Sequence, residues 1–302
     1  MRAKPLLLAL ALAAGSPAAR AQEIEPRAYT NTPIGVNFVI LGVTWSDGAL
    51  IFDPAVPLTD ANLKTPAALF AYAYSFGMGG KNAKLDVIVP YTWLSGNAKY
   101  RGELVEREVD GFADPRVRLS VNFVGAPALP VKDFKAYAPD VIVGASLQVS
   151  VPVGQYDPDR LVNIGTNRWS WKAELGASKA KGPWTFELAV AATLYDDNDD
   201  FYGGIAREQD PLYAGQAHVV YGFRSGSWLA LDATFYRGGR TTLDGVKGND
   251  LQSNWRGGAT LALPVNRRNS IKLYASSGVS ARTGNDYDLF GCGWQHRWGG
   301  GL

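Results

Sequence analysis

Cysteine and histidine are nearly absent from this sequence of 302 residues, which contains one cysteine, Cys292, and two histidines. A single cysteine cannot form an internal disulfide, so the fold has to be stabilised by other means. Glycine-rich phosphate loops, nucleotide motifs and His/Cys clusters at metal-ligand spacing are also lacking. The sequence therefore predicts no cofactor, no metal site and no catalytic residue.

Long apolar runs and an excess of charge are missing too. No apolar stretch reaches the roughly 18 residues that indicate a transmembrane helix, which excludes helical membrane spans. The 30 Lys and Arg residues nearly balance the 28 Asp and Glu residues, and three of the basic residues lie within positions 1–21. The remaining chain is close to neutral, so a nucleic-acid partner has no support.

The first 21 residues have the pattern of a secretory signal peptide. Two basic residues precede an apolar run from Leu6 to Ala14, and a small-residue cleavage pattern follows at Ala19–Ala21. The apolar run is too short for a membrane-anchoring helix. We expect residues 1–21 to be cleaved off and residues 22–302 to form one exported domain.

What fills the rest of the chain is alternation of apolar and polar residues. In residues 114–125, Val117, Leu119 and Val121 alternate with arginines and small polar residues. A period of two is typical of a β-strand whose two faces see different surroundings. About twelve such segments, mostly of nine to thirteen residues, follow one another, and no segment of helical period competes with them in length. The sequence predicts an all-β fold.

The connections between these segments alternate between long polar loops and short turns, with 125–139 and 282–287 as exceptions. Transmembrane antiparallel up-and-down β-barrels have long external loops and short periplasmic turns, whereas a soluble β-sandwich has no reason to sort its loops in this way. We therefore expect the apolar face of each strand to meet lipid and the charged face to line the lumen of a barrel.

Tryptophan supports the same prediction. Its indole ring favours the boundary between membrane and water, and outer-membrane barrels carry aromatic girdles at both boundaries. All nine tryptophans fall within a few residues of a predicted strand end, namely Trp45, Trp93, Trp169, Trp171, Trp184, Trp228, Trp255, Trp294 and Trp298. Core tryptophans of a sandwich would be spread more evenly along the strands.

Three segments resemble the transporters of the phenol-degradation meta-pathway family. They are GFADPRVRLSVNF (111–123), SLQVSVPVGQYDPDRLVNIGTNRWSWKAELGASKAKGPW (146–184) and the closing stretch from Tyr274. The most specific marks are the Gly-Phe-Ala-Asp turn and the stretch from Pro152 to Asp157, and the likeness extends over nearly all of the mature chain. The resemblance implies a Gram-negative outer-membrane β-barrel that moves small, often aromatic molecules. It brings no set of binding residues.

The predicted inner faces carry charged and aromatic side chains that could line a permeation path. Because buried charges must be paired, the same residues could instead brace or plug the barrel, and the two interpretations are not exclusive. Tyr236 and Tyr72 could offer further faces to an aromatic solute. The candidate lumen residues are Arg116, Arg118, Lys172, Glu174, Glu187, His218, Asp232, Arg256, Lys272 and Tyr274.

His218 and Asp232 also suggest an alternative function. A short turn between their strands would place them opposite or diagonal to each other, as in the His–Asp pair of an outer-membrane lipase or protease. Nucleophilic catalysis would need a positioned serine as well, and no G-x-S-x-G motif is present. A hydrogen-bonded lumen pair is the favoured interpretation. A structural or adhesive barrel that acts through its loops is the third possibility.

Two remaining features have simple interpretations. The acidic run from Asp196 to Asp200 lacks the ligand spacing and closing glutamate of an EF-hand loop, so a solvated acidic loop tip is favoured over a Ca²⁺ site. Cys292 is expected among lipid-facing positions as a small hydrophobic residue.

The leading prediction is an outer-membrane channel or transporter for small, hydrophobic or aromatic solutes, with passive passage through the barrel and no enzymatic activity. The expected partners are outer-membrane lipid, the solute itself and the barrel-assembly machinery during biogenesis. The expected location is the outer membrane of a Gram-negative bacterium.

Overall fold

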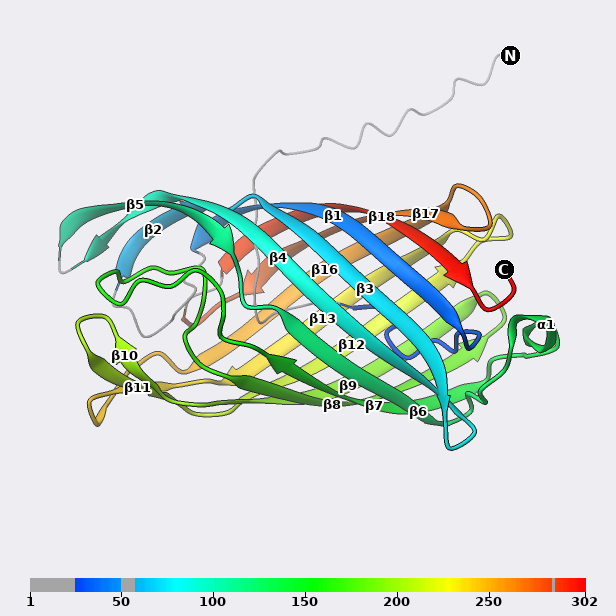
Figure 1. Ribbon diagram of the computed structural model, residues 1–302. Helices are drawn as coiled ribbons and strands as arrows, with labels where there is room; N and C mark the ends of the chain where they lie inside the picture. The colour runs from blue at the N-terminus through cyan, green and yellow to red at the C-terminus, as the bar shows by residue number, and fades with distance from the viewer. Residues whose placement is uncertain (1–24, 50–57, 101, 284–285) are drawn as a thin grey trace, which may run out of the picture.

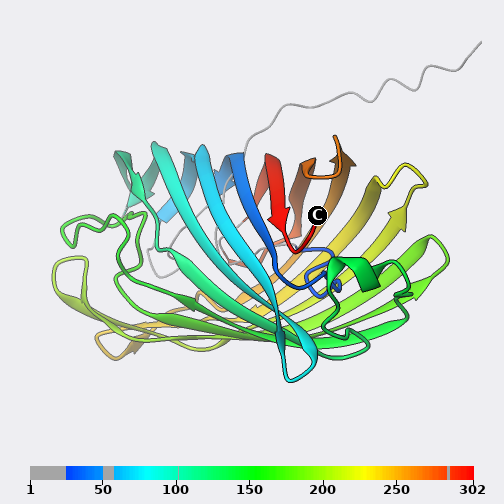
Figure 2. The same cartoon turned by 45° about the vertical axis from the view of Figure 1, so that its right-hand side comes forward.

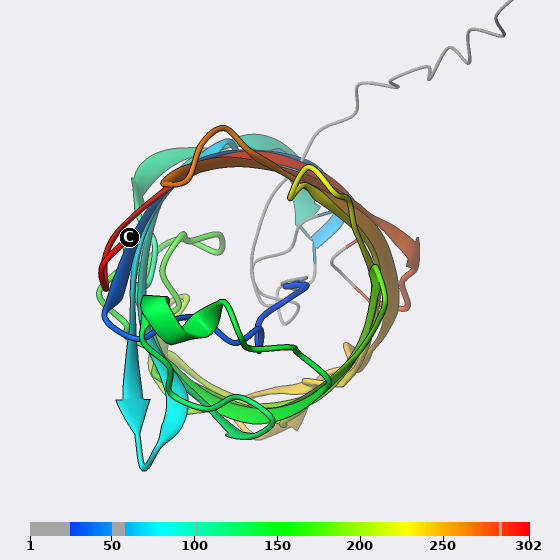
Figure 3. The same ribbon diagram turned by 90° about the vertical axis from the view of Figure 1, so that its right-hand side faces the viewer.

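The computed structural model describes residues 25–49, 58–100, 102–283 and 286–302, so the predicted signal peptide lies outside the described residues. The main sheet has 14 strands, and twelve of them form a closed barrel wall (Figures 1 and 3). The wall strands are β1 (Val36–Ala49), β3 (Ala67–Met78), β4 (Lys81–Tyr100), β6 (Arg116–Val124), β7 (Val141–Ser150), β8 (Ser170–Lys181), β9 (Trp184–Tyr195), β12 (Leu212–Gly222), β13 (Trp228–Gly238), β16 (Gln252–Pro264), β17 (Asn269–Ser280) and β18 (Asp286–Gly299).

The wall has the simplest possible topology. Each wall strand pairs antiparallel with the wall strand before it, and β18 pairs with β1 from Val36↔Gly299 to Ala49↔Asp286 to close the ring. Closure leaves the wall without an unpaired edge, which is the condition for crossing hydrocarbon with strands. The predicted fold class, an all-β up-and-down barrel of about twelve strands, is confirmed.

The side chains are arranged inside out compared with a soluble protein. On β6, Leu119 and Phe123 point outward and are 38% and 43% exposed, whereas Ser120 and Asn122 point inward and are 8% and 4% exposed. The alternation of outer and inner positions holds on the other wall strands too: the outer positions carry large exposed apolar side chains, and the inner positions carry polar residues or, on β1 and β3, mainly apolar residues such as Ala71 and Ala73. The apolar faces therefore form the outer surface, as the sequence predicts.

Aromatic side chains mark both ends of this outer surface. Trp45 stacks on Phe290 and Trp93 packs on Tyr91 near the long-loop end, while Trp184 packs on Tyr221 near the turn end. Seven of the nine tryptophans are 39–48% exposed, which fits girdles at two membrane boundaries.

Two aromatic residues do not lie where the sequence suggested. Trp228 takes the inner face of β13, in line with buried Ala230 and Asp232, so its assignment to a girdle is wrong. Tyr72 lies on the outer face of β3, between buried Ala71 and Ala73, with its ring near Trp298. A lumen position for Tyr72 is therefore wrong too. On β3 the odd-numbered residues face the lumen and the even-numbered residues face outward.

The turn end contains short connections and one long one. Gly79 and Gly80 both have positive φ, which a tight two-residue hairpin between β3 and β4 requires. The connection 125–140 is longer and includes α1 (Val131–Phe134). Within the described residues, no helix is long and apolar enough to cross a membrane.

The long-loop end contains strands where the sequence predicted only loops (Figures 1 and 2). Two of them pair with the C-terminal half of β4 and extend the wall at this end. Four more pair with one another in a separate small sheet. The extending strands are β2 (Leu58–Lys64) and β5 (Glu103–Phe112), and the small sheet consists of β10 (Asn198–Phe201), β11 (Ile205–Gln209), β14 (Thr241–Leu243) and β15 (Val246–Lys247).

Candidate functional site: the barrel lumen

The inner face of the barrel divides into two halves of different chemistry. From the first part of β4, with Asn82, Lys84 and Asp86, through β6 to β13 it carries carboxylates, basic groups and amides, and on β1, β3 and positions 88–90 of β4 it is mainly apolar. The alternation and the register place all ten candidate lumen residues on the inner face. The apolar positions include Phe38, Ile40, Leu69, Ala71, Ala73, Ile88 and Pro90.

Residues 25–35 lie inside the barrel and leave it at the turn end, as the end-on view shows (Figure 3), and their side-chain and backbone contacts are with the charged half. We call them the N-terminal plug. The backbone near its outer end is fixed by the turn-end connection, since Ile34 N donates to Leu129 O at 2.9 Å and the Asn31 amide donates to Pro127 O at 3.2 Å. The unusual length of the 125–140 connection thus has a structural reason: it holds the plug.

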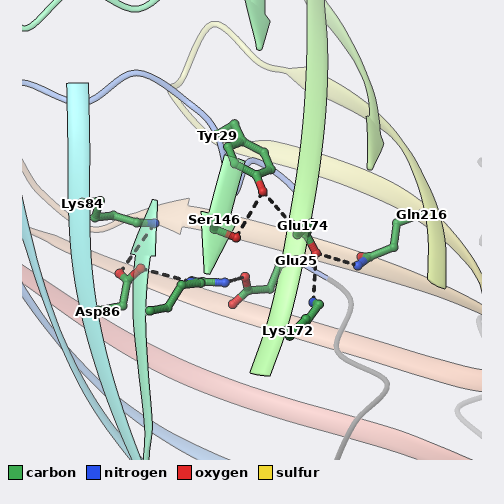
Figure 4. Close-up of polar contacts among 9 residues, drawn as sticks. Glu25, Tyr29, Lys84, Asp86, Ser146, Lys172, Glu174 and Gln216 are labelled. Atoms are coloured by element: carbon green, nitrogen blue, oxygen red, sulfur yellow. Dashed lines mark hydrogen bonds and ion pairs between the residues drawn. The ribbon is translucent and has the colours of Figure 1, made fainter. Parts of the chain in front are cut away.

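The tip of the plug joins a chain of charged groups (Figure 4). Arg118 on β6 forms an ion pair with Glu25 of the plug and donates from Nε to Asp86 at 3.1 Å. Lys84 lies 3.6 Å from the same Asp86 carboxylate. Glu25 therefore supplies the second negative charge for a wall segment that carries two basic groups and one carboxylate.

Tyr29 anchors the middle of the plug. Its hydroxyl donates to Glu174 at 3.0 Å and lies 3.3 Å from the Ser146 hydroxyl (Figure 4). Its ring lies on Gly144 and Gly176, which are paired across β7 and β8, and a Cβ on either glycine would overlap the ring. Tyr29 is 8% exposed. The two glycines form a flat seat that a larger residue would fill.

Glu174 is shared between the plug and the wall. Besides Tyr29, it accepts from Lys172 at 2.9 Å and from the Gln216 amide at 3.4 Å (Figure 4). Of the two sequence interpretations of these charges, the contacts fit a braced and plugged wall on this half of the lumen.

Arg27 binds the next part of the charged half. Its backbone N–H donates to Glu187 at 2.6 Å, and its guanidinium lies 5.4 Å from the Trp228 ring centroid. This contact explains the inward position of Trp228: the indole offers an aromatic face to a cation instead of a girdle to lipid.

His218 and Asp232 form the hydrogen-bonded pair that the sequence suggests. Nδ1 of His218 lies 2.7 Å from Asp232 Oδ1, and Thr260 donates to the other carboxylate oxygen at 3.2 Å. The register places Glu187 opposite His218 on β9. A hydrolase would need a serine at that place, so the surroundings of His218 do not resemble a catalytic triad.

Arg256 is a structural residue of the inner wall. It is 1% exposed, its guanidinium stacks on the Tyr287 ring at 3.8 Å, and it donates to Tyr287 O and to the Ser276 hydroxyl at 3.0 and 2.9 Å. Tyr236 is also buried on the inner face, on β13. A solute does not reach side chains so completely covered.

Lys272 and Tyr274 are less buried than Arg256 and Tyr236. They lie on the inner face of β17, which pairs with β16 and β18; Lys272 is exposed and Tyr274 is half-buried. Arg116 lies at the long-loop end of β6, opposite Ser150. Cys292 takes an outer position between Phe290 and Trp294, in line with the expectation for a lipid-facing residue.

The family marks in the sequence form a staple at the long-loop end. Asp114, 3% exposed, accepts hydrogen bonds from Gly154 N, Thr166 N and the Thr166 hydroxyl at 2.9, 2.8 and 2.7 Å. It thereby connects the loop between β7 and β8 to the segment that directly precedes β6. Asp114 lies 40 and 52 positions before Gly154 and Thr166 in the chain. The spacing of these residues in the sequence therefore does not predict the contact.

Several of these residues were not found from the sequence. The plug has no periodic pattern, so the sequence does not indicate a role for Glu25, Arg27 or Tyr29. Asn198 was assigned to a solvated acidic loop tip, yet it is 1% exposed and its amide donates to the Tyr156 hydroxyl at 2.9 Å, so that assignment is wrong for Asn198. One signal was available: inward charges on β4, β6 and β9 need partners, and the plug supplies some of them.

Within the described ranges, no group of three or more His, Cys, Asp or Glu side chains is arranged to hold a metal ion.

The barrel is similar to solved outer-membrane structures. An outer membrane channel from Pseudomonas putida F1 matches with a TM-score of 0.77 and 19% identity, over 91% of this chain and 100% of that chain. The β domain of the Bordetella autotransporter BrkA matches with a TM-score of 0.52 and 10% identity, over 88% of this chain and 100% of that chain. At these identities the likeness establishes the fold alone. No curated protein matches the sequence.

A family profile covers residues 47–294, which is most of the sequence and includes the Asp114 staple and the whole charged half of the wall. The chain therefore belongs to the family described as "Putative MetA-pathway of phenol degradation".

Proposed function

We propose that the chain is an outer-membrane channel through which small hydrophobic or aromatic solutes pass without an energy source. The observation that carries this proposal is the divided lumen. The plug binds the charged half through Glu25, Arg27 and Tyr29, and the apolar half on β1 and β3 offers a surface suited to apolar solutes. The relative from Pseudomonas putida F1 is described as an outer membrane channel, which agrees with this function.

Delivery to the membrane follows from the same proposal. Residues 1–21 act as a cleaved signal peptide, residues 22–302 form the barrel domain, and the barrel-assembly machinery inserts it into the outer membrane. Protein from the outer-membrane fraction should then have Gln22 as its first residue. A protein that retains Met1 and the following residues would contradict this part.

The channel function is tested in liposomes that contain the refolded barrel. Swelling in the salt of an aromatic acid, at a pH at which the acid is ionised, should be faster than swelling of protein-free liposomes. Liposomes with heat-unfolded protein are the matched control, because they contain the same chain without a lumen. Swelling equal to that of protein-free liposomes for every small solute contradicts a channel.

An adhesive role is the second candidate, and one observation favours it. Strands β10, β11, β14 and β15 pair in an ordered sheet beyond the wall, although a simple pore needs no structured loops. Deletion of residues 240–249 separates the two functions. Adhesion would be lost with this segment, whereas a channel would still conduct.

A further inference from the structure

We propose that the outer face of the barrel, where β17 meets β18 at the turn end, binds the headgroup of an anionic phospholipid, phosphatidylglycerol. This inference concerns the membrane around the barrel and goes beyond the channel function, on which it does not depend. Three observations carry it: a stack of aromatic rings on the outer face of β18, polar side chains beside that stack, and arginines without a carboxylate side chain near them.

The aromatic stack lies at the last residues of β18. Trp294, His296 and Trp298 follow one another at every second position on the outer side of this strand, which ends at Gly299. The His296 ring stacks between the two indoles, with ring centroids 5.8 Å from each and interplanar angles of 23° and 22°. Because indoles favour the boundary between membrane and water, the stack places His296 at the depth of the lipid headgroups.

The outer surface is polar around this stack. Nδ1 of His296 lies 2.9 Å from Oδ1 of Asn269, its partner in the register between β17 and β18. On the side of β1, the Asn37 amide donates to Trp298 O at 3.5 Å, and the Tyr72 hydroxyl donates to Asn37 at 2.6 Å. Hydrocarbon offers no partner to such groups, so their presence on a lipid-facing surface indicates contact with headgroups.

The contacts of Asn269 fix the proton on the His296 ring. The Asn269 amide nitrogen donates to Asn266 Oδ1 at 2.9 Å, so its oxygen is directed to His296 and accepts the hydrogen of Nδ1. In a neutral imidazole the other nitrogen, Nε2, is then an acceptor. Nε2 makes no hydrogen bond among the described residues. It is suited to accept from a hydroxyl group of a ligand.

Two exposed arginines lie in the turn next to the stack. Arg267 and Arg268 belong to the turn between β16 and β17, which lies beside the end of β18 (Figure 1). Arg297 holds this turn against β18, since its Nε donates to Arg267 O and its backbone N–H to Arg268 O, both at 2.8 Å. Asn266 Oδ1 accepts from the backbone N–H groups of Arg268 and Asn269 at 2.9 Å. The two side chains therefore extend from a fixed backbone.

The charge of these arginines is not balanced by the surrounding wall. Four stretches that form β16, the turn halves of β17, β18 and β1, and β3 contain neither Asp nor Glu, and all four belong to the described part of the chain. They are 34–45, 67–78, 252–275 and 289–302. Arg268 donates to the main-chain oxygen of the final residue, Leu302, at 3.3 Å. Even with one negative charge at that residue, three arginines leave an excess of positive charge.

An anionic phospholipid matches this set of groups. Its phosphate oxygens accept from the guanidinium groups of Arg267 and Arg268, which are suited to phosphate. A hydroxyl of the glycerol headgroup donates to Nε2 of His296, and the acyl chains lie along the outer wall past Trp294. Because short turns are typical of the periplasmic end, this site faces the inner leaflet of the outer membrane.

The test is a titration of the refolded barrel in nonionic detergent with dihexanoyl phosphatidylglycerol, in which native mass spectrometry counts the bound lipid. Phosphatidylmethanol with the same chains keeps the charged phosphodiester but lacks the hydroxyls, and dihexanoyl phosphatidylcholine balances the phosphate with a cation. The wild-type barrel should bind phosphatidylglycerol about five- to twentyfold more tightly than phosphatidylcholine, with phosphatidylmethanol in between.

Two variants assign these preferences to the site. Arg267→Gln combined with Arg268→Gln should remove the preference for phosphatidylglycerol over phosphatidylcholine. His296→Phe keeps three stacked rings without Nε2, so it should bind phosphatidylglycerol and phosphatidylmethanol equally. Lys132→Gln combined with Lys135→Gln removes two exposed cations elsewhere at the turn end and is the matched control, with binding like wild type. Circular dichroism and heat-dependent migration on SDS gels check that each variant folds.

The site is overturned if wild type binds phosphatidylcholine as tightly as phosphatidylglycerol, or if the arginine double variant keeps the preference. Displacement of the lipid by inorganic phosphate at equal concentration would show a site for free anions, and tighter binding of lipid A would show a site for the other leaflet. Either result contradicts the assignment to phospholipid. A barrel that binds phosphatidylglycerol but does not conduct in liposomes would support this site and contradict the channel.

Discussion

At the scale of single residues, the structure assigns different tasks to neighbours on one strand. Val121 and Arg118 are three positions apart on β6 and point to opposite faces. Val121 meets the membrane, whereas Arg118 joins Asp86 of the wall to Glu25 of the plug. The sequence predicted both faces correctly but could not name the partners of Arg118, because Asp86 is 32 and Glu25 93 positions away in the chain.

Val121→Arg should destabilise the barrel by roughly 2–4 kcal/mol, the range for arginine near the membrane midplane. Arg118→Ala should change conductance or ion preference more than stability, since it removes an inner charge and an ion pair of the plug. A folding titration in lipid and single-channel recording measure the two effects. If Val121→Arg is neutral and Arg118→Ala prevents membrane assembly, the two faces have been exchanged.

Tyr29→Ala should loosen the plug. The substitution removes a ring seated on Gly144 and Gly176 and two hydroxyl contacts, about 2 kcal/mol in total, which corresponds to a roughly thirtyfold lower ratio of plugged to unplugged molecules. In planar bilayers the single-channel conductance should rise, or channel openings should become more frequent. Tyr29→Phe keeps the ring and serves as the control with a smaller effect. Equal conductance of Tyr29→Ala and wild type would show that the plug does not limit passage.

At the scale of elements, the prediction from sequence was accurate where periodicity is strong and incomplete where it is absent. The twelve wall strands follow from alternation, because every wall residue faces either lipid or lumen. The plug and the loop from Val151 to Trp169 lack alternation, and they are held by individual hydrogen bonds such as those of Asp114 and Asn198. Such contacts depend on three-dimensional proximity, which one sequence does not reveal.

Asp114→Ala should release the loop between β7 and β8. The change leaves Gly154 N, Thr166 N and the Thr166 hydroxyl without their shared acceptor, and hydrogen bonds to a charged group contribute about 1.5–3 kcal/mol each. Trypsin should then cleave faster after Arg160, an exposed residue of that loop, while the barrel remains folded. Asp159→Asn, an exposed aspartate of the same loop, is the control. An unchanged cleavage rate in Asp114→Ala would contradict the staple.

At the scale of the whole molecule, closure and orientation decide how the parts work together. Because β18 pairs with β1 along its whole length, the barrel has no free edge. It should therefore migrate differently on SDS gels with and without boiling. Identical migration, with the protein in the soluble periplasmic fraction, would contradict a membrane barrel.

Closure also means that a solute entering at the long-loop end meets the plug at the turn end, so the orientation of the two ends in the membrane matters for function.

We predict that the long-loop end faces the outside of the cell and the plug end faces the periplasm, since outer-membrane barrels have longer external loops. In a Cys292→Ala background, Asp197→Cys should react with a membrane-impermeant maleimide on intact cells, whereas Ser225→Cys should react only after lysis. Both positions are exposed, so accessibility of the side chain does not distinguish them. The reverse labelling pattern would invert the barrel and place the plug at the outer mouth. A solute arriving from outside the cell would then meet the plug before it meets the rest of the lumen.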